Sequence, residues 1–212
     1  MVVEKAKDFW VKYQRPLMIV SALVIIIAGG FLGYKNFVKL PNEAKAEDAI
    51  FKAEEYYRMD SLDKALNGDM LNAGFLKVIS KYGNTDAGKR ARLYAGDCLL
   101  RKGDFAQAVK YLKEFSTDSK MIQAVAYKLT ADAYSEQGKN DEAIDYYKKA
   151  AHHFEADKDN SSLYLSMAAG LCEKTGKTKE AIELYKELKE KFPKTAAGFD
   201  ADKYLGKLGA YN

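Results

Sequence analysis

The chain has 212 residues, of which 48% are hydrophobic and 30% charged, a composition typical of an ordinary globular protein. Its formal net charge is +4, but residues 1–41 hold six basic and two acidic residues, which leaves 28 of each sign in residues 42–212. Because the main body is neutral and carries no block of like charge, we expect no nucleic-acid partner. Alanine, lysine, glutamate, leucine and tyrosine are abundant, which favours helices.

An uncharged apolar segment follows a short N-terminal tail, residues 1–15. Residues 16–34 read PLMIVSALVIIIAGGFLGY, and as a helix they would span about 28 Å, close to the roughly 30 Å of a bilayer core. Basic and aromatic residues lie on both sides of the run, as interfacial anchors do. We therefore predict a transmembrane helix at residues 16–37, with Pro16 in its first turn, where a missing N–H is harmless.

The apolar segment has two alternative interpretations besides a membrane anchor. Small residues at Ala28-Gly29-Gly30 would suit a cleaved signal peptide, although the apolar run continues beyond them. A buried core helix is disfavoured because nothing polar interrupts the run. Gly29 and Gly33 form a GxxxG pair that would let another membrane helix approach closely. The basic residues flanking the segment favour a cytoplasmic N-terminus only slightly.

Three stretches of the main body nearly repeat one another: GDFAQAVKYLKEF from Gly103, GKNDEAIDYYKKA from Gly138 and GKTKEAIELYKEL from Gly176. Aligned alanines at 65, 108, 143 and 181 give spacings of 43, 35 and 38 residues. A small residue stands seven positions before each glycine (Gly96, Ala131, Ala169), and a large one stands four positions after the last three alanines (Leu112, Tyr147, Tyr185). Such periods and spacings resemble the tetratricopeptide repeat, in which small and large side chains interlock successive helical hairpins.

Together with the apolar segment, the resemblance implies an all-α fold, an N-terminal transmembrane helix followed by a tetratricopeptide-repeat (TPR) helical solenoid over residues 42–212. The expected units are about 43–82, 89–118, 124–154 and 162–193, followed by a capping helix at about 195–208. The capping helix is expected because KYGNTDAGKRARLYAG and KFPKTAAGFDADKYLG share seven aligned identities. In the first unit Asp60 stands where the other units have glycine, and an insert at about residues 67–75 predicts a loop, either with a special role or as a tolerated surface insertion.

Catalytic and metal-binding patterns are absent from the sequence. Cys98 and Cys172 are 74 residues apart and lack zinc-type spacing, so we expect both to be buried and inert. His152 and His153 are adjacent, point about 100° apart on a helix, and are expected to pack rather than bind metal. No phosphate-binding, dinucleotide-binding or nucleophile-elbow motif occurs. We expect no enzyme activity, cofactor, metal or small-molecule substrate.

The function of stacked hairpins lies in the curved inner surface formed by the first helix of each unit. Transfer of the family's groove positions by register predicts a partner-binding groove. Its residues are Arg90, Leu93, Asp97, Leu100, Arg101, Lys128, Asp132, Ser135, Glu136, Ser166, Glu173 and Lys174, with Val125, Leu163 and Gly170 at equivalent places. The asparagines of the family's carboxylate-clamp members are missing at these places, so we do not expect that mode of binding.

Three further stretches resemble a specific family. EKAKDFWVKYQRPLMIV, AEEYYRMDSLDKALNGD and EKFPKTAAGFDADKYLGKL are similar to the ancillary subunits of the SecYEG translocon, in the form found in Bacteroidota. The resemblance implies a single-pass protein of the bacterial inner membrane, with a cytoplasmic N-terminus and a periplasmic TPR domain. Its partners would be the translocon and chaperones or client polypeptides. The alternative is a structural subunit of an envelope assembly or secretion complex.

Overall fold

The computed structural model describes residues 2–210, which form eleven α-helices and one short π-helix. No strand occurs in this part of the chain; the one β-type contact is an isolated bridge between Gly68 and Ala73. The chain divides into two compact units, one ending at Lys45 and one beginning at Ala46. The predicted all-α class is confirmed.

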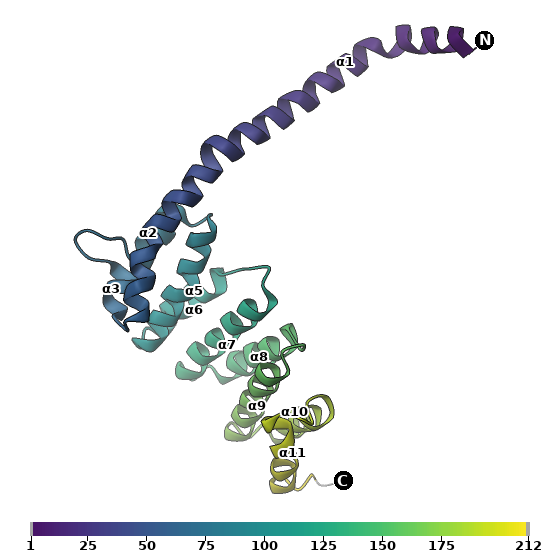
Figure 1. The fold of residues 1–212 in the computed structure, drawn as a ribbon. Helices are drawn as coiled ribbons and strands as arrows, with labels where there is room; N and C mark the ends of the chain where they lie inside the picture. Colours follow the sequence, from purple (N-terminus) through teal and green to yellow (C-terminus); the bar gives the residue numbers. More distant parts are fainter. Residues whose placement is uncertain (1, 211–212) are drawn as a thin grey trace. The chain divides into compact units, whose positions relative to one another are not determined.

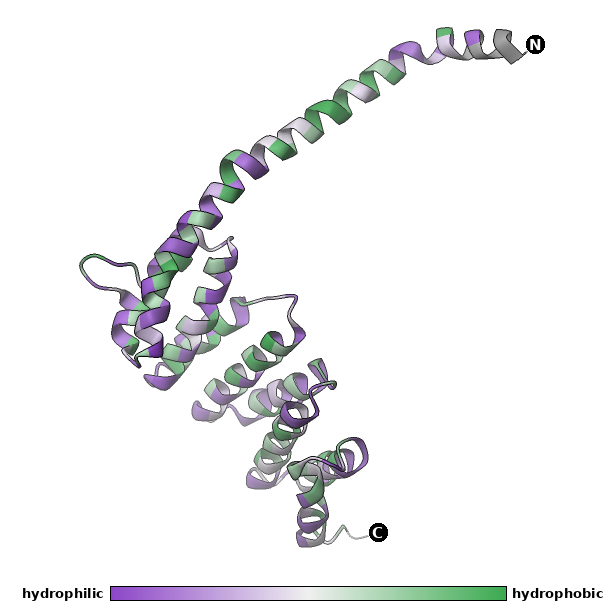
Figure 2. Cartoon of the chain, in the orientation of Figure 1, coloured by the Kyte–Doolittle hydropathy of each residue, from purple (hydrophilic) through white to green (hydrophobic). Residues whose placement is uncertain are grey.

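The first unit is a run of helix without a break. It comprises α1 (Val2–Tyr34), the π-helix η1 (Lys35–Lys39) and the start of α2 (Leu40–Arg58). The apolar side chains of α1 are exposed along its middle, where Figure 2 shows a green band; Ile25, Ile26 and Ile27 are 68–70% accessible. By length and composition, this helix is long and apolar enough to cross a membrane, and none of its apolar window is buried among the described residues.

Pro16 is a correction to the sequence-based account. It lies inside α1 rather than in its first turn. The prediction began the helix at the apolar segment, but the tail before Pro16 contains neither glycine nor another proline and is rich in residues that favour helices. The helix therefore starts well before Pro16 and tolerates the hydrogen bond that a proline removes.

The second unit is a succession of antiparallel helices, shown from blue to yellow in Figure 1. From α4 onward, each helix packs against the next one in the chain. After α2 these helices are α3 (Leu62–Asn67), α4 (Phe75–Tyr82), α5 (Asp86–Arg101), α6 (Phe105–Glu114), α7 (Lys120–Glu136), α8 (Asn140–His153), α9 (Lys158–Lys174), α10 (Thr178–Lys191) and α11 (Ala196–Lys207). The solenoid is thus confirmed, whereas the division of these helices into repeat units stays a prediction.

The turns inside the hairpins share one backbone conformation. Gly103, Gly138 and Gly176 follow α5, α7 and α9 with φ of 83°, 72° and 77°, a region that side chains resist. Asp60, at the corresponding place after α2, has φ of 59° and is the one described non-glycine residue with positive φ. The first hairpin therefore makes the same left-handed turn without the glycine.

Small residues face large ones between the helices of a hairpin, as the repeats predict. Ala131 and Ala169 are fully buried, as is each aligned alanine of the repeats. At Gly96 the fit is so close that a Cβ atom would lie 2.5 Å from Leu112 Cγ. Two buried apolar clusters meet at α7, where Ala133 joins the cluster of the preceding helices and Ala131 joins that of the following ones. Helix α7 therefore contributes to both clusters and links the hairpins on either side of it in the chain.

The two similar stretches KYGNTDAGKRARLYAG and KFPKTAAGFDADKYLG each contain the start of a helix, built in the same way. Thr85 and Thr195 cap α5 and α11 by accepting hydrogen bonds from Gly88 N and Gly198 N, at 3.0 and 3.2 Å. The two glycines are required because a Cβ at either place would lie about 2 Å from the carbonyl oxygen of the preceding helix end. The threonine and glycine that the two stretches share thus determine how each of these helices begins after the preceding one.

The insert divides the second helix of the first hairpin into α3 and α4. The loop between them, Gly68–Gly74, exposes Met70 and Leu71 almost completely. Its backbone is fixed by Asp69, whose carboxylate accepts hydrogen bonds from Leu71 N at 2.9 Å and Asn72 N at 2.7 Å. The insert is therefore an ordered loop that carries an apolar tip.

Candidate partner-binding groove

The predicted groove residues lie on three helices. Those from Arg90 to Arg101 lie on α5, those from Val125 to Glu136 on α7, and those from Leu163 to Lys174 on α9. None of the fifteen is buried: each is partly or largely accessible. Because α5 also contacts α7, the first two helices present adjoining faces.

A first cleft, here cleft 1, has a volume of about 410 Å³ and lies between α5, the α6–α7 connection and the start of α7. It includes two of the predicted residues, Arg90 and Leu93. Its lining is Asp86, Lys89, Arg90, Leu93, Tyr94, Phe115, Ser116, Thr117, Asp118 and Ile122. The lining therefore combines apolar side chains from both helices with two basic and two acidic groups.

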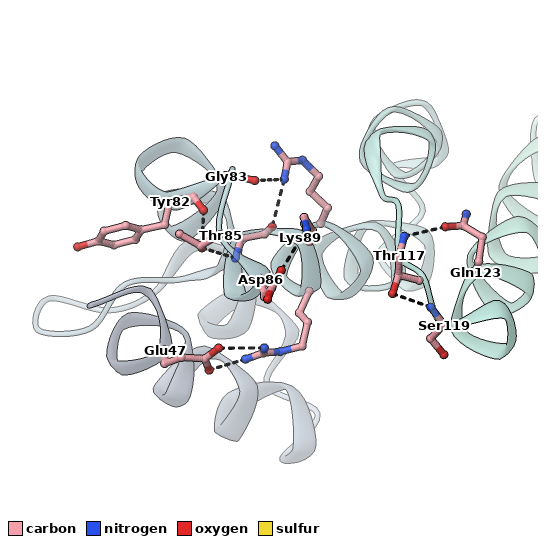
Figure 3. A network of polar contacts seen from close by, with 12 residues as sticks. Glu47, Tyr82, Gly83, Thr85, Asp86, Lys89, Thr117, Ser119 and Gln123 are labelled. Atoms are coloured by element: carbon pink, nitrogen blue, oxygen red, sulfur yellow. Dashed lines mark hydrogen bonds and ion pairs between the residues drawn. The ribbon is translucent and has the colours of Figure 1, made fainter. Parts of the chain in front are cut away.

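Three of the four charged groups that line cleft 1, Arg90, Lys89 and Asp86, are engaged by neighbouring side chains. Arg90 forms a two-pronged contact with Glu47 (Nη1 to Oε1 3.0 Å, Nη2 to Oε2 2.6 Å), and its Nε lies 3.4 Å from Glu54 Oε1. The hydrogen bond with Arg90 lowers the pKa of Glu47. Lys89 pairs with Asp86 at 3.0 Å. Figure 3 shows Glu47, Asp86 and Lys89 around the start of α5.

The connection that borders cleft 1 is held in place by side-chain contacts. Gln123 Oε1 accepts from Thr117 N at 3.1 Å, and Thr117 Oγ1 accepts from Ser119 N at 3.3 Å (Figure 3). Gln123 is buried, so its amide is fixed by packing as well. The rim of the cleft is therefore preformed, as binding sites for partners usually are.

A second cleft, here cleft 2, has a volume of about 560 Å³ and brings together five of the predicted residues. It lies where α5 and α7 end and α6 begins, with one residue each from α8 and α9. Its lining is Leu100, Arg101, Gly103, Phe105, Asp132, Ser135, Glu136, Tyr147 and Met167. The predicted residues Asp97, Lys128, Ser166, Glu173 and Lys174 line neither of the two clefts.

Three groove carboxylates accept hydrogen bonds from tyrosines, which the sequence analysis missed. Tyr57 donates to Asp97 at 2.7 Å, Tyr147 to Asp132 at 2.6 Å and Tyr185 to Glu173 at 3.1 Å. Burial, followed by the bond to the carboxylate, raises the pKa of each of these tyrosines. Tyr147 and Tyr185 were recognised as recurring large residues, but nothing in the repeat pattern indicates that their hydroxyl groups orient the acids of the groove.

Several of the remaining charged residues of the predicted groove form ion pairs. Arg101 contacts Asp60 and lies 3.8 Å from Asp97, Lys128 lies 2.7 Å from Asp132, and Lys207 lies 2.9 Å from Glu173. Glu136 and Lys174 differ, because neither has an ion-pair or side-chain hydrogen-bond partner among the described residues. These two charges are therefore available to a ligand without breaking an internal contact.

The cysteines are poor nucleophiles. Both are free and fully buried in separate helices. Burial raises the pKa of Cys98 to about 12 and that of Cys172 to about 11, so both thiols stay protonated near neutral pH.

The two histidines face different neighbours, as expected for adjacent helical residues. His153 packs edge-on against Tyr127, with ring centroids 5.2 Å apart. His152 Nδ1 lies 3.1 Å from Glu155 Oε1 and 3.6 Å from Glu187 Oε1, an arrangement that the sequence analysis did not anticipate. These three groups are close enough to hold a metal ion, but the Lys191 ammonium lies 3.0–3.1 Å from both carboxylates. The group is thus arranged as an ion-pair network with its own cation.

Gly29 and Gly33 belong to the first unit. A Cβ atom at either position would meet no atom within 4 Å, so the described part of the chain places nothing against this face of α1. The predicted contact with another membrane helix stays a prediction.

Comparison with known proteins bears on the fold rather than on a specific activity. The family described as Tetratricopeptide repeat-like domain matches residues 7–130, more than half of the chain. A second family, described as Tetratricopeptide repeat, matches residues 128–196. No curated protein matches the chain.

Proposed function

Because the chain belongs to the family of tetratricopeptide repeat-like domains, we propose that it is a non-enzymatic adaptor that binds proteins along α5, α7 and α9. The observation that supports this most is the pair of clefts along these helices, which include seven of the twelve predicted groove residues. Repeat solenoids use extended surfaces of this kind to bind partners.

We further propose that α1 anchors the protein as a single-pass protein of the bacterial inner membrane. Its uncharged run of about 28 Å and its exposed apolar side chains favour a span. In this arrangement the N-terminus is cytoplasmic and the helical solenoid is periplasmic. An anchor raises the local concentration of the groove beside other membrane proteins, so weak contacts suffice.

The partners we propose are the Sec translocon and periplasmic chaperones, which the protein would link as an accessory subunit. The support is the similarity of the three sequence stretches to the translocon's ancillary subunits. A purely structural subunit of an envelope complex would need the same repeats only as packing surface.

Affinity purification of the full chain from detergent-solubilised membranes tests this function. We expect translocon subunits to co-purify with the unmodified chain and to be lost with Leu163→Glu, which places a charge on a half-exposed groove position of α9. Glu183→Lys, an exposed change on α10, serves as the matched control and should retain them. Repeated absence of translocon subunits from the unmodified sample would reject the proposed partner, and retention by Leu163→Glu would reject the groove.

A further inference from the structure

Cleft 2 combines an apolar floor with an acidic rim. Leu100 and Phe105 come from one hairpin, Tyr147 from the next and Met167 from α9. Three of these four side chains are partly accessible, and Tyr147 is nearly buried with its hydroxyl bonded to Asp132. The floor can therefore receive an aliphatic chain, because burying apolar surface away from water is favourable.

The charges at the rim of cleft 2 do not balance. Arg101 is neutralised by Asp60 and Asp97, and the charge of Asp132 is countered by Lys128 at 2.7 Å. The lining itself holds one basic group, Arg101, and two acids, Asp132 and Glu136. Glu136 is the acid without an ion-pair or side-chain hydrogen-bond partner among the described residues.

Cleft 1 gives an internal contrast. It has a similar volume and apolar lining, but its lining carries two basic and two acidic groups, whereas that of cleft 2 carries one basic and two acidic groups. Arg90 and Lys89 are paired with Glu47 and Asp86. The charges that line cleft 1 are therefore balanced, whereas those that line cleft 2 favour a cation.

From this we infer that cleft 2 is a subsite for a basic residue, an arginine or lysine side chain from an extended segment of the bound protein. The methylene stem would lie over Leu100, Phe105 and Met167, and the cationic group would meet Glu136. A long basic side chain suits such a site because its stem is apolar while its end is charged. An acidic residue would be repelled, and a purely apolar one would remove water from Glu136 without compensation.

This inference rests on the proposed function, since it names the partner chemistry of the same groove. The probes are three ten-residue serine–alanine peptides that differ only at the central residue, which is Arg, Leu or Glu. Binding to the full chain in detergent micelles is followed by the NMR signal of the Met167 methyl group. The Met121 methyl, which does not line cleft 2, reports on unspecific effects.

We expect the Arg peptide to shift the Met167 signal at the lowest concentration and the Glu peptide at the highest. Glu136→Gln should weaken the Arg peptide about two- to fivefold, the range of an exposed ion pair, and leave the Leu peptide unchanged. Glu183→Gln, an exposed glutamate on α10, should change neither affinity.

Equal affinities for the Arg and Leu peptides, or no effect of Glu136→Gln on the Arg peptide, would overturn the inference and leave the adaptor function standing. A Met167 signal that none of the three peptides moves at millimolar concentration would overturn it as well. The adaptor function fails separately, if Leu163→Glu does not release the co-purifying partner.

Discussion

The hairpin α7–α8 and the hairpin that begins with α2 make the same kind of turn with different residues. In the first, Gly138 makes the turn and α8 continues for 14 residues. In the second, Asp60 makes the turn, and the returning helix is divided into α3 and α4 by the loop at Gly68–Gly74. The two hairpins share the left-handed turn and the buried alanine that follows it, Ala143 or Ala65. Continuity of the second helix is not required.

Core packing should be as tight in the interrupted hairpin as in the regular ones. Phe75 of α4 is fully buried and stacks on Tyr94, with ring centroids 5.4 Å apart. Phe75→Ala should lower the free energy of unfolding by about 3–5 kcal/mol, similar to Leu165→Ala in α9. Chemical denaturation measures both, and a cost below about 1 kcal/mol for Phe75→Ala would show that the interrupted hairpin is loosely packed.

The loop of the interrupted hairpin should depend on its glycines. A Cβ at Gly74 would lie 2.2 Å from Gly68 N and 2.4 Å from Asn67 C, both backbone atoms that cannot move aside. Gly74→Ala should therefore destabilise the protein by about 1–3 kcal/mol. Gly170→Ala in α9 is the opposite control, because no atom lies within 4 Å and alanine favours the helix by about 1 kcal/mol. Equal effects of the two substitutions would contradict the structure of the loop.

The two turns should respond differently to substitution. Gly138→Ala places a side chain at φ of 72° and should cost about 1 kcal/mol. Asp60→Gly relieves the same conformation but removes the contact with Arg101, so the two effects should nearly cancel. Thermal unfolding of the two variants checks this, and a larger loss for Asp60→Gly would mean that the ion pair, rather than the backbone, holds the first turn.

The smallest expected effect is a pH dependence at the Glu47–Arg90 pair, which joins α2 to α5. The pKa of Glu47 is lowered in the folded state, so the pair stabilises the protein above the usual glutamate pKa and this contribution is lost as the pH falls through the lowered value. The side chains are 40% and 50% exposed, so about 0.2–1 kcal/mol is expected. The free energy of unfolding of Glu47→Gln should differ from that of the unmodified chain by this amount at pH 7 and coincide with it once the pH is well below the lowered pKa. A difference that persists in acid would assign the effect to packing.

Much of this fold could be predicted because its rules are local and repeated. The glycines, alanines and large residues of the repeats lie where their spacing placed them, and even Asp60 takes the glycine conformation. Features that depend on two distant side chains could not be predicted. The bond from Tyr57 to Asp97 joins residues 40 positions apart, and no period encodes it. Register predicts the groove residues, but which of them line a cleft depends on the connections between the helices.

Site-specific photo-crosslinking in intact membranes tests the adaptor function most directly. A photoreactive residue at Ser135, in cleft 2, is compared with one at Glu183, on an exposed part of α10. The account predicts crosslinks to translocon or chaperone polypeptides from Ser135 and none from Glu183. Crosslinks of equal yield from both positions, or from Glu183 alone, would contradict a partner-binding groove along α5, α7 and α9.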